Sequence, residues 1–282
     1  MAVDNKGPHI LLLGGGYTLQ EVARRLPAHS FVITSRDATR VEEFRKLGWC
    51  SAVVDNANEQ SLGRVFSEFP TISHVVDSVP PLQGADPSIG ARVCASFFGS
   101  AAVQRVIYLS TTGVFGVRDG SWVDESTPEQ PWSPPGRARL ECELAYRNAG
   151  LTVTSLRLPA IYGPGRGTEL SIKSGRYRLV EDGSNWTNRI HVEDLAAVII
   201  AALKAERLPP TLCVSDDEPA QAKVVVEYFC QKFSLPLPPS VSRDDLLQQG
   251  AFTLLSNQRV RNARMKEYLG VSLRYPNFRS AA

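Results

Sequence analysis

The first chemistry that the sequence suggests is phosphate binding at a run of glycines. Gly14, Gly15 and Gly16 follow the apolar run His9–Leu13, a predicted strand, and they precede a predicted helix over Thr18–Leu26. In a dinucleotide-binding loop, one glycine permits the tight turn and a second lets the backbone approach the diphosphate, whose charge then faces the helix N-terminus. Gly14 and Gly16 occupy these two positions.

The loop departs from this fingerprint at its third position. Leu19 stands where a third glycine would ease helix–strand packing. The placement between the first strand and the first helix nevertheless favours a dinucleotide site, in which Tyr17 and Thr18 join Gly14 and Gly16 as cofactor-binding residues. A glycine-rich turn without a ligand is the alternative.

The end of the second predicted strand, Phe31–Thr34, indicates which dinucleotide is bound. A carboxylate at this point holds the ribose 2′-hydroxyl of NAD, whereas a guanidinium suits the 2′-phosphate of NADP. The sequence has Ser35 and Arg36 there, which favours NADP as the cofactor. Asp37, one residue later, leaves NAD as the alternative.

Short apolar runs alternate with helical stretches over the first half of the chain. Strands are predicted at Ser51–Asp55, His74–Ser78, Arg105–Ser110 and Thr152–Leu158, and helices at Ala38–Leu47, Glu59–Glu68, Ser88–Ala102 and Gly136–Asn148. Such alternation is typical of a parallel sheet covered by helices on both faces. The predicted fold class is therefore α/β, a Rossmann-type doubly wound parallel sheet with a smaller C-terminal substrate lobe.

The pattern changes after Tyr162. Residues 163–185 are rich in glycine and arginine and are expected to be irregular, and helices are predicted at His191–Leu203 and Ala220–Phe233. We expect a dinucleotide-binding lobe over residues 7–162, to which 189–204 return. The smaller substrate lobe is then expected to comprise 163–188 and 205–282.

Four segments carry a family resemblance. Leu109–Gly116, with the sequence Leu-Ser-Thr-Thr-Gly-Val-Phe-Gly, resembles the extended short-chain dehydrogenase/reductase family, which includes nucleotide-sugar epimerases and dehydratases and some atypical members. The resemblance recurs at 156–165 and 188–195, and weakly at 214–219, in the family's order. It implies an NAD(P)-binding oxidoreductase or an epimerase/dehydratase-like enzyme with a small-molecule substrate.

The resemblance assigns roles to individual residues. Thr111 takes the position of the hydroxyl that hydrogen-bonds the substrate oxygen in the family, with Thr112 as a second candidate; satisfying the backbone at a strand end is the alternative for Thr111. Asp55 matches the position that flanks the adenine. Ser78, at the end of the fourth predicted strand, is a further candidate cofactor contact.

The family's Tyr-x-x-x-Lys pair is missing. Pro135 stands at the tyrosine position and Arg139 at the lysine position, four residues apart on one helical face. Arg139 can replace lysine in contacting the ribose, but Pro135 cannot transfer a proton. Tyr162 is a candidate substitute donor, with aromatic packing as the alternative. Two functions stay open: an NADP-dependent enzyme with a degenerate site, or a non-catalytic dinucleotide-binding redox sensor or regulator.

Composition and charge indicate which classes of partner and which cellular compartment to expect. The formal net charge is only +2, which gives no basic footprint for nucleic acid. The five widely spaced cysteines favour a reducing, cytoplasmic setting, and His191 stands alone, so no metal site is expected. Met1–Pro8 is polar and no apolar run is long enough to span a membrane, so neither a signal peptide nor a membrane anchor is expected.

Substrate and assembly are less sharply indicated. Arg157, Arg166, Arg176 and Arg178 suit an anionic or nucleotide-linked substrate, although arginines on an exposed surface are the alternative. The family often dimerises through the helices predicted here at Ser88–Ala102 and Gly136–Asn148, so both a monomer and a homodimer are expected possibilities.

Overall fold

The computed structural model describes residues 7–280, so residues 1–6, which carry most of the stretch used to judge a signal peptide, lie outside the described residues. The chain forms two compact units. The first unit contains the described residues up to Ser110, together with Ala138–Leu156 and Ala196–Thr211. The second contains Thr111–Arg137, Arg157–Leu195 and the described residues from Leu212 onward.

The division between the units differs from the expected lobes most in one large segment, and residues 157–162, 189–195 and 205–211 also fall in the other unit. Residues 111–137 belong to the second unit, although the sequence pattern places them in the dinucleotide lobe. The reason is long-range pairing: β6 (Trp122–Val123) pairs in parallel with β15 (Arg259–Val260), near the C-terminus. Pairing over more than a hundred residues leaves no local signal in the sequence.

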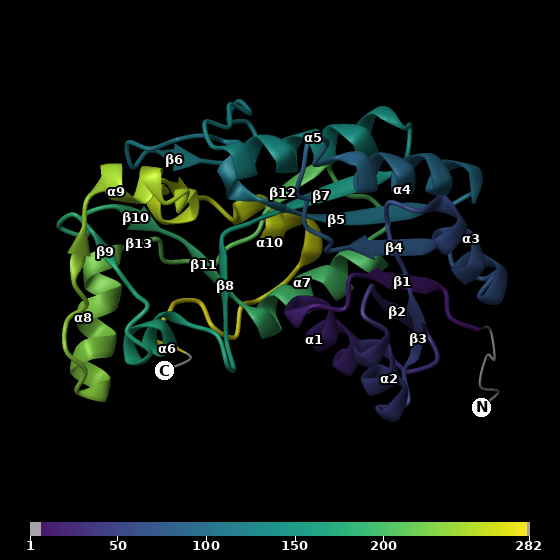
Figure 1. Cartoon of the computed structure of the whole chain (residues 1–282), viewed down its shortest axis with the longest axis horizontal. Helices are drawn as coiled ribbons and strands as arrows, with labels where there is room; N and C mark the ends of the chain where they lie inside the picture. Colours follow the sequence, from purple (N-terminus) through teal and green to yellow (C-terminus); the bar gives the residue numbers. More distant parts are fainter. Residues whose placement is uncertain (1–6, 281–282) are drawn as a thin grey trace. The chain divides into compact units, whose positions relative to one another are not determined.

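A seven-stranded sheet organises the first unit, with the order β12-β7-β5-β4-β1-β2-β3 (Figure 1). Its strands are β1 (Ile10–Leu13), β2 (Phe31–Ser35), β3 (Cys50–Val53), β4 (His74–Asp77), β5 (Arg105–Thr111), β7 (Val153–Leu158) and β12 (Thr211–Cys213). The neighbouring strands from β5 to β3 pair in parallel. The predicted Rossmann-type α/β sheet is confirmed.

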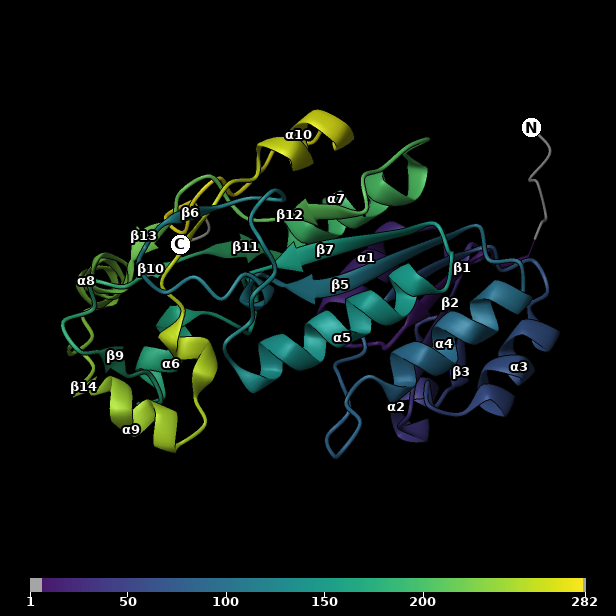
Figure 2. The same cartoon turned by 90° about the horizontal axis from the view of Figure 1, so that it is seen from above.

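Helices cover both faces of this sheet, as expected. They are α1 (Tyr17–Arg25), α2 (Ala38–Lys46), α3 (Glu59–Glu68), α4 (Ile89–Ser100), α5 (Pro134–Asn148) and α7 (Val192–Lys204). Helices α4 and α5 lie along one face, and α7 lies on the other (Figure 2). The core between the sheet and α3, α4 and α5 contains buried aliphatic and aromatic side chains, among them Leu11, Val75, Phe98 and Tyr146.

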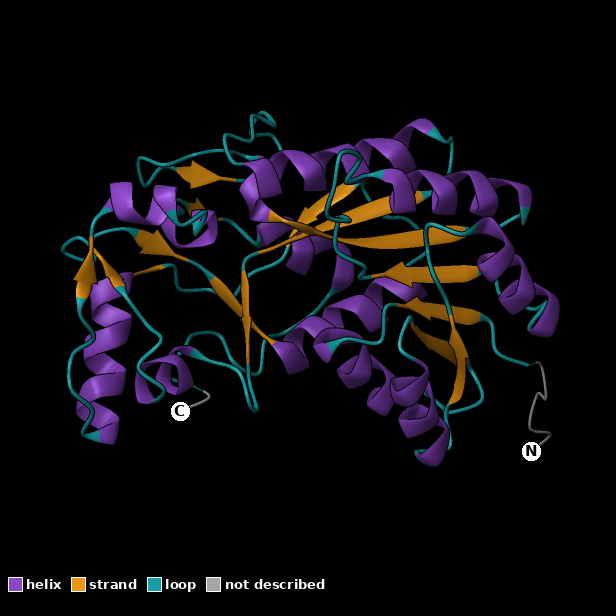
Figure 3. Cartoon of the chain, viewed as in Figure 1, coloured by secondary structure: helices purple, strands orange, loops and turns teal. Residues whose placement is uncertain are grey.

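The second unit contains short strands and helices (Figure 3). Besides β6 and β15 it has β8 (Ala160–Tyr162), β9 (Leu179–Val180), β10 (Trp186–Thr187), β11 (Arg189–His191), β13 (Ala220–Gln221), β14 (Ser240–Val241), α6 (Thr168–Lys173), α8 (Ala222–Phe233), α9 (Arg243–Gln248) and α10 (Ala263–Leu269), and the 3₁₀ turns are η1 (Thr112–Val114) and η2 (Phe252–Leu255). Residues 163–185 are therefore not wholly irregular: α6 forms because Ile172 packs into a core with Phe229. No helix among the described residues is long and apolar enough to cross a membrane.

A buried carboxylate ends β4. Asp77 is 1% exposed; its Oδ2 accepts a hydrogen bond from the Tyr146 hydroxyl at 2.6 Å, and its Oδ1 accepts one from the Val79 amide at 2.8 Å. Burial outweighs these bonds and raises the pKa of Asp77 to about 6. Because the folded state holds this proton more tightly than the unfolded chain, Asp77 contributes most to stability below about pH 4. That contribution is lost as the pH rises through 6.

Replacing Asp77 by Asn should remove this pH dependence while keeping the shape of the side chain. The free energy of unfolding of Asp77→Asn, relative to the wild type, should rise between pH 4 and pH 7.5, by up to about 3 kcal/mol. Denaturant unfolding across this range measures it. Asp86→Asn is a control of opposite sign, because a hydrogen bond from Arg92 lowers the pKa of the exposed Asp86. Parallel stability curves for wild type and Asp77→Asn would contradict the assignment.

Candidate functional site

The carboxyl ends of the parallel strands form one edge of the sheet, where ligands of open α/β sheets bind. Strand order reverses between β1 and β4, which are neighbours in the sheet but are separated in sequence by β2 and β3. Gly14 follows β1, Arg36 follows β2 and Ser78 follows β4, so three of the predicted cofactor-binding residues come to this edge. Asp55 lies two residues beyond the end of β3.

The glycine loop has the local geometry that a diphosphate site needs. Gly14 has φ +90°, and a Cβ there would lie 3.0 Å from Ser78 Oγ. Gly15 is packed even more closely, because a Cβ would lie 2.6 Å from the Phe44 ring. Gly16, by contrast, faces open space and is the N-cap of α1 without any side-chain cap. The backbone at Gly16 is therefore accessible to a ligand, and no acidic side chain stands in the first turn of α1.

The missing third glycine is explained by packing. Leu19 is fully buried, so α1 contacts the sheet through a large side chain at this position. Thr34 of β2 holds the glycine loop through two hydrogen bonds. Its hydroxyl accepts one from the Gly14 amide at 3.1 Å, and its carbonyl accepts one from the Gly15 amide at 2.5 Å. Thr18 is also buried, and Tyr17 is half-buried at the start of α1.

The end of β2 presents a cation rather than a carboxylate. Asp37 is the N-cap of α2, where its side chain accepts from the Thr39 amide at 2.9 Å. The Ser35 hydroxyl accepts from the Asp37 amide at 3.1 Å, which leaves its own hydrogen free to be donated. Arg36 is exposed and has no hydrogen-bond or ion-pair partner among residues 7–280. Arg40, which the sequence reasoning did not consider, is exposed on the first turn of α2.

Ser78 contacts the glycine loop itself. Its hydroxyl donates toward the Gly14 carbonyl at 2.7 Å, so its single hydrogen is used within the protein. Asp55 turns its carboxylate back on its own loop, where Oδ1 accepts from the Ala57 amide at 3.1 Å. Both residues lie at the strand ends, but these hydrogen bonds hold the loops in shape.

Arg139 is anchored by the protein at one end of its guanidinium. Its Nη1 donates to the Leu109 carbonyl at 3.0 Å and the Val79 carbonyl at 3.3 Å, and it lies 3.1 Å from the Tyr108 hydroxyl. Nε and Nη2 have no partner among the described residues and remain available. Pro135, one turn earlier on α5, is exposed and has no hydroxyl, so no proton donor stands at this position.

Sequence reasoning missed a buried acid one turn further along α5. Glu143 is fully buried and accepts a hydrogen bond from the Ser110 hydroxyl on β5, and it pairs with Arg147 at 3.1 Å. The spacing of Arg139, Glu143 and Arg147 at every fourth residue is visible in the sequence. The partner on β5 is not, because it lies 33 residues away.

Thr111 ends β5 and precedes the turn η1. Its hydroxyl oxygen accepts from the Gly113 amide at 3.2 Å, which is the backbone role considered as the alternative. Because an acceptor bond uses only a lone pair, the hydroxyl hydrogen can still be donated to a ligand oxygen. Thr112, the second candidate, is buried.

Tyr162 and His191 form an aromatic group within the second unit. The Tyr162 hydroxyl donates to the Asn277 carbonyl at 3.2 Å, and its ring meets the His191 ring edge-on at 5.1 Å. Burial raises the pKa of Tyr162 well above its usual value. His191 is buried, and its Nδ1 accepts from the Glu193 amide at 3.2 Å. These contacts favour a packing role for both residues.

Arg157 fits neither the anion-binding role considered for it nor the alternative, an arginine on an exposed surface. It is 1% exposed, forms an ion pair with Glu129 and lies over the Phe115 ring at 4.9 Å. Its position in β7 buries it, which the sequence could not show. Within residues 7–280, no group of three His, Cys, Asp or Glu residues could hold a metal ion, and the five cysteines are free thiols.

Comparisons with known proteins agree with the fold. Residues 10–212 match the family model described as the NAD dependent epimerase/dehydratase family. A functionally unknown conserved protein from Silicibacter pomeroyi is 34% identical, with 97% of this chain and 96% of that chain covered and a TM-score of 0.80. The Bordetella bronchiseptica enzyme WbmG, solved in complex with NAD and UDP, is 18% identical over 99% and 93% of the two chains, with a TM-score of 0.79, which shows the fold alone.

A curated relative matches over a shorter stretch. The 3-diazoavenalumate denitrifying reductase of a Streptomyces species is 32% identical over 117 residues, and the match spans 39% of this chain and 38% of that protein. The resemblance to extended short-chain dehydrogenases/reductases is confirmed, because the matching family model spans most of the chain. This chain is a member of the NAD dependent epimerase/dehydratase family.

Proposed function

We propose that this protein is an NADP(H)-dependent oxidoreductase that transfers a hydride without the family's tyrosine. The observation that carries the proposal is the end of β2, where an unpaired guanidinium takes the place of the carboxylate that selects NAD. When bound, the dinucleotide supplies or accepts the hydride. The chain's own residues bind it, orient it and contact the substrate.

The choice of NADP rests on Arg36 and Asp37. Asp37 points its carboxylate at the first turn of α2, where it satisfies the Thr39 amide. A carboxylate used as a helix N-cap contributes to the stability of that helix, so moving it to bind a ribose would have a cost. Arg36 and the hydroxyl of Ser35 offer the donors that a 2′-phosphate accepts, and Arg40 adds a second cation one turn away.

The diphosphate would be held by the loop around Gly16. Gly14 and Gly15 cannot carry a side chain without meeting Ser78 or Phe44, whereas Gly16 meets nothing within 4 Å. This open side lies at the start of α1, where the dipole of the helix favours an anion. Nε and Nη2 of Arg139 are proposed to contact the nicotinamide ribose, in place of the family's lysine.

The reacting end lacks a strong acid or base. Pro135 cannot exchange a proton, and the Tyr162 hydroxyl already donates its hydrogen to the Asn277 carbonyl. Thr111 retains a hydroxyl hydrogen, which is proposed to polarise the substrate oxygen or a corresponding acceptor atom. A substrate whose reduced form needs no protein-derived proton fits this site best. The curated relative named as a reductase supports reduction as the direction.

A second function is favoured by a specific observation. The guanidinium of Arg139 is tied to the Leu109 and Val79 carbonyls, and the residue one turn before it is a proline. An arrangement that binds a dinucleotide rigidly but moves no proton also suits a redox sensor, which would report the NADPH to NADP⁺ ratio. Tight binding of NADPH with no turnover across a broad panel of carbonyl compounds would select this function.

Arg36→Ala should selectively weaken the binding of NADPH. Losing charge-assisted hydrogen bonds to the 2′-phosphate should raise the Kd for NADPH about 10- to 100-fold. The Kd for NADH, which lacks this phosphate, should change by less than about twofold. Calorimetric or fluorescence titration measures both. Arg45→Ala is the matched control, because Arg45 is an exposed arginine of α2 that pairs with Glu42. An equal loss for both dinucleotides would refute the assignment of Arg36.

Thr111→Val and Tyr162→Phe separate the two hydroxyls at the reacting end. Thr111→Val should lower the turnover of NADPH with an accepted substrate about 10- to 100-fold, because it removes a hydroxyl hydrogen that is not bonded within the described residues. Its Kd for NADPH should not change. Tyr162→Phe should leave turnover within about twofold, since its hydroxyl bonds Asn277. A large loss in Tyr162→Phe with none in Thr111→Val would reverse the roles.

A further inference from the structure

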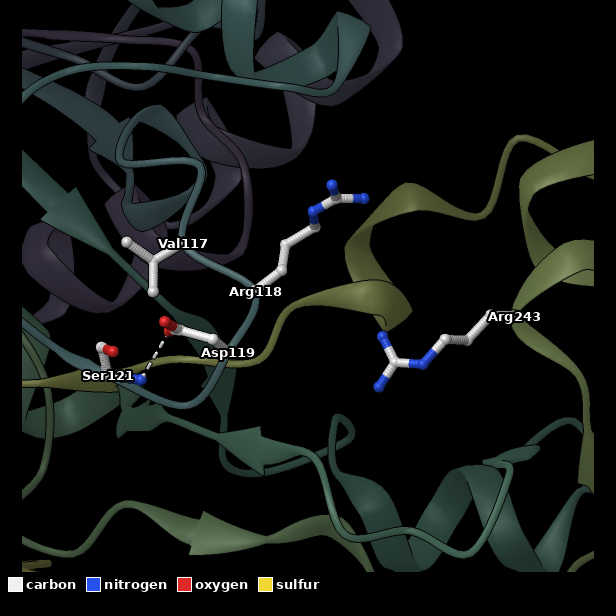
Figure 4. Close-up of a pocket in the computed structure, with 5 residues that line it drawn as sticks. All are labelled: Val117, Arg118, Asp119, Ser121 and Arg243. Carbon is white, nitrogen blue, oxygen red and sulfur yellow. Dashed lines mark hydrogen bonds between the residues drawn. The ribbon is translucent and has the colours of Figure 1, made fainter.

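A pocket of about 470 Å³ lies within the second unit, between the loop Val117–Ser121 and the start of α9 (Figure 4). The residues that line it are Val117, Arg118, Asp119, Ser121 and Arg243. All five belong to the second unit, and none is among the residues proposed to bind the dinucleotide or to contact the reacting atoms. The pocket therefore requires its own explanation.

The loop side of the pocket is fixed by bonds that do not involve the Arg118 side chain. The Gly120 amide donates to the Asn257 carbonyl at 3.0 Å, and Asn257 Nδ2 donates to the Arg118 carbonyl at 3.1 Å. Arg259 Nε donates to the Gly120 carbonyl at 2.7 Å. Gly120 has φ +82°, which a side chain would strain. The loop is thus held in one shape before any ligand arrives.

The opposite side of the pocket is placed by a small apolar core. Leu246 of α9 packs with Val180 and Leu255, and Trp132 packs against this cluster. Trp132 also meets Phe252 edge-on at 5.7 Å, which ties the segment that carries Trp132 to η2. These contacts fix the start of α9.

The two arginines that line the pocket keep hydrogen-bond donors that no described residue uses. The Arg118 guanidinium lies over the Trp132 ring at 4.8 Å and has no carboxylate partner among the described residues. Arg243 bonds Glu181 through Nε at 2.9 Å, and its two terminal amino groups have no partner in residues 7–280. Figure 4 shows both guanidinium groups extending into the same space.

Asp119, the acidic residue among those that line the pocket, already accepts a hydrogen bond within its own loop. The Asp119 carboxylate accepts from the Ser121 amide at 3.0 Å, and hydrogen bonds from Ser121 lower the pKa of Asp119. Figure 4 shows this bond at the edge of the loop, where it turns Asp119 toward Ser121. With Asp119 bonded to Ser121 and Glu181 bonded to Arg243, Arg118 is the guanidinium of the lining that no described carboxylate pairs.

We propose that this pocket binds an oxyanion group, a phosphate or a carboxylate, of a small-molecule ligand. Guanidinium groups offer pairs of parallel donors that match the oxygens of either group. Because the loop and α9 are held by other contacts, little ordering is needed on binding. The competing explanation is that Arg118 only covers Trp132 and that Arg243 only pairs with Glu181. The proposal does not depend on which dinucleotide the first unit binds, or on hydride transfer.

Titration of the full-length protein with inorganic phosphate and with citrate tests the proposal. The titrations use an Arg36→Ala background at constant ionic strength, so that the phosphate contact proposed for Arg36 does not contribute. Calorimetry should show saturable binding of at least one anion. Arg118→Ala and Arg243→Gln should each weaken it at least about fivefold. Arg264→Ala, an exposed arginine of α10 outside the pocket, should leave it unchanged.

The results of these titrations distinguish a phosphate-bearing ligand, a carboxylate ligand and the absence of an anion site. Saturation by phosphate alone assigns a phosphate-bearing ligand, and saturation by citrate alone assigns a carboxylate. A change in intrinsic fluorescence that disappears in Trp132→Phe would place the anion beside Arg118. Thermal unfolding checks that Arg118→Ala still folds, and Arg118→Lys, which keeps the charge, should show an intermediate affinity. No saturation with either anion, or equal affinity in all variants, would overturn the proposal.

Discussion

The turn Asp77–Val79 connects the glycine loop to the helix that packs over the sheet. On one side, the Ser78 hydroxyl bonds the Gly14 carbonyl, and Val79 fills the space beside Gly14 where a Cβ would point. On the other side, Asp77 accepts a hydrogen bond from the hydroxyl of Tyr146, a residue of α5. Burying a carboxylate costs free energy, but this carboxylate also accepts a hydrogen bond from the Val79 amide. The shape of the proposed phosphate cradle therefore depends on one buried side chain of β4.

Arg139 joins the same turn through the Val79 carbonyl, and this explains why arginine suits a position that is lysine in the family. A guanidinium can reach the Val79 and Leu109 carbonyls from one nitrogen while Nε and Nη2 stay free. In the family, lysine lowers the pKa of the tyrosine one turn earlier. With Pro135 there, no pKa needs lowering, and the residue can serve as an anchor. The two departures from the family's pattern are thus consistent with each other.

The elements of the first unit could be predicted because their signals are local. Each strand from β1 to β5 contains a short run of apolar residues, and each helix between them has its own apolar face, so most bounds fell within two residues of the structure. The glycine loop and Arg36 could also be found, because they follow strands directly. Short elements such as β6 and α6 could not, since they form through contacts with distant segments rather than through their own pattern.

The burial of charged residues could not be predicted from the sequence, because it too depends on contacts with distant segments. Nothing distinguishes Glu143 or Arg157 in sequence from exposed residues of the same type. Their burial follows from partners 33 and 28 residues away, Ser110 and Glu129. Asp77 is a stronger case, because its partner Tyr146 is 69 residues distant. Sequence patterns indicate which face of an element is apolar, but not which charged group has been compensated.

The distribution of guanidinium groups bears on how this chain recognises ligands. The net charge of +2 is too small to attract anions by a general field. Several surface arginines, such as Arg25, Arg45 and Arg92, are paired with carboxylates. Arg36 and Arg118 are exposed without such a partner among the described residues. Recognition of anions by this protein must then be local, and the selectivity at each place follows from the geometry of the loop that carries the arginine.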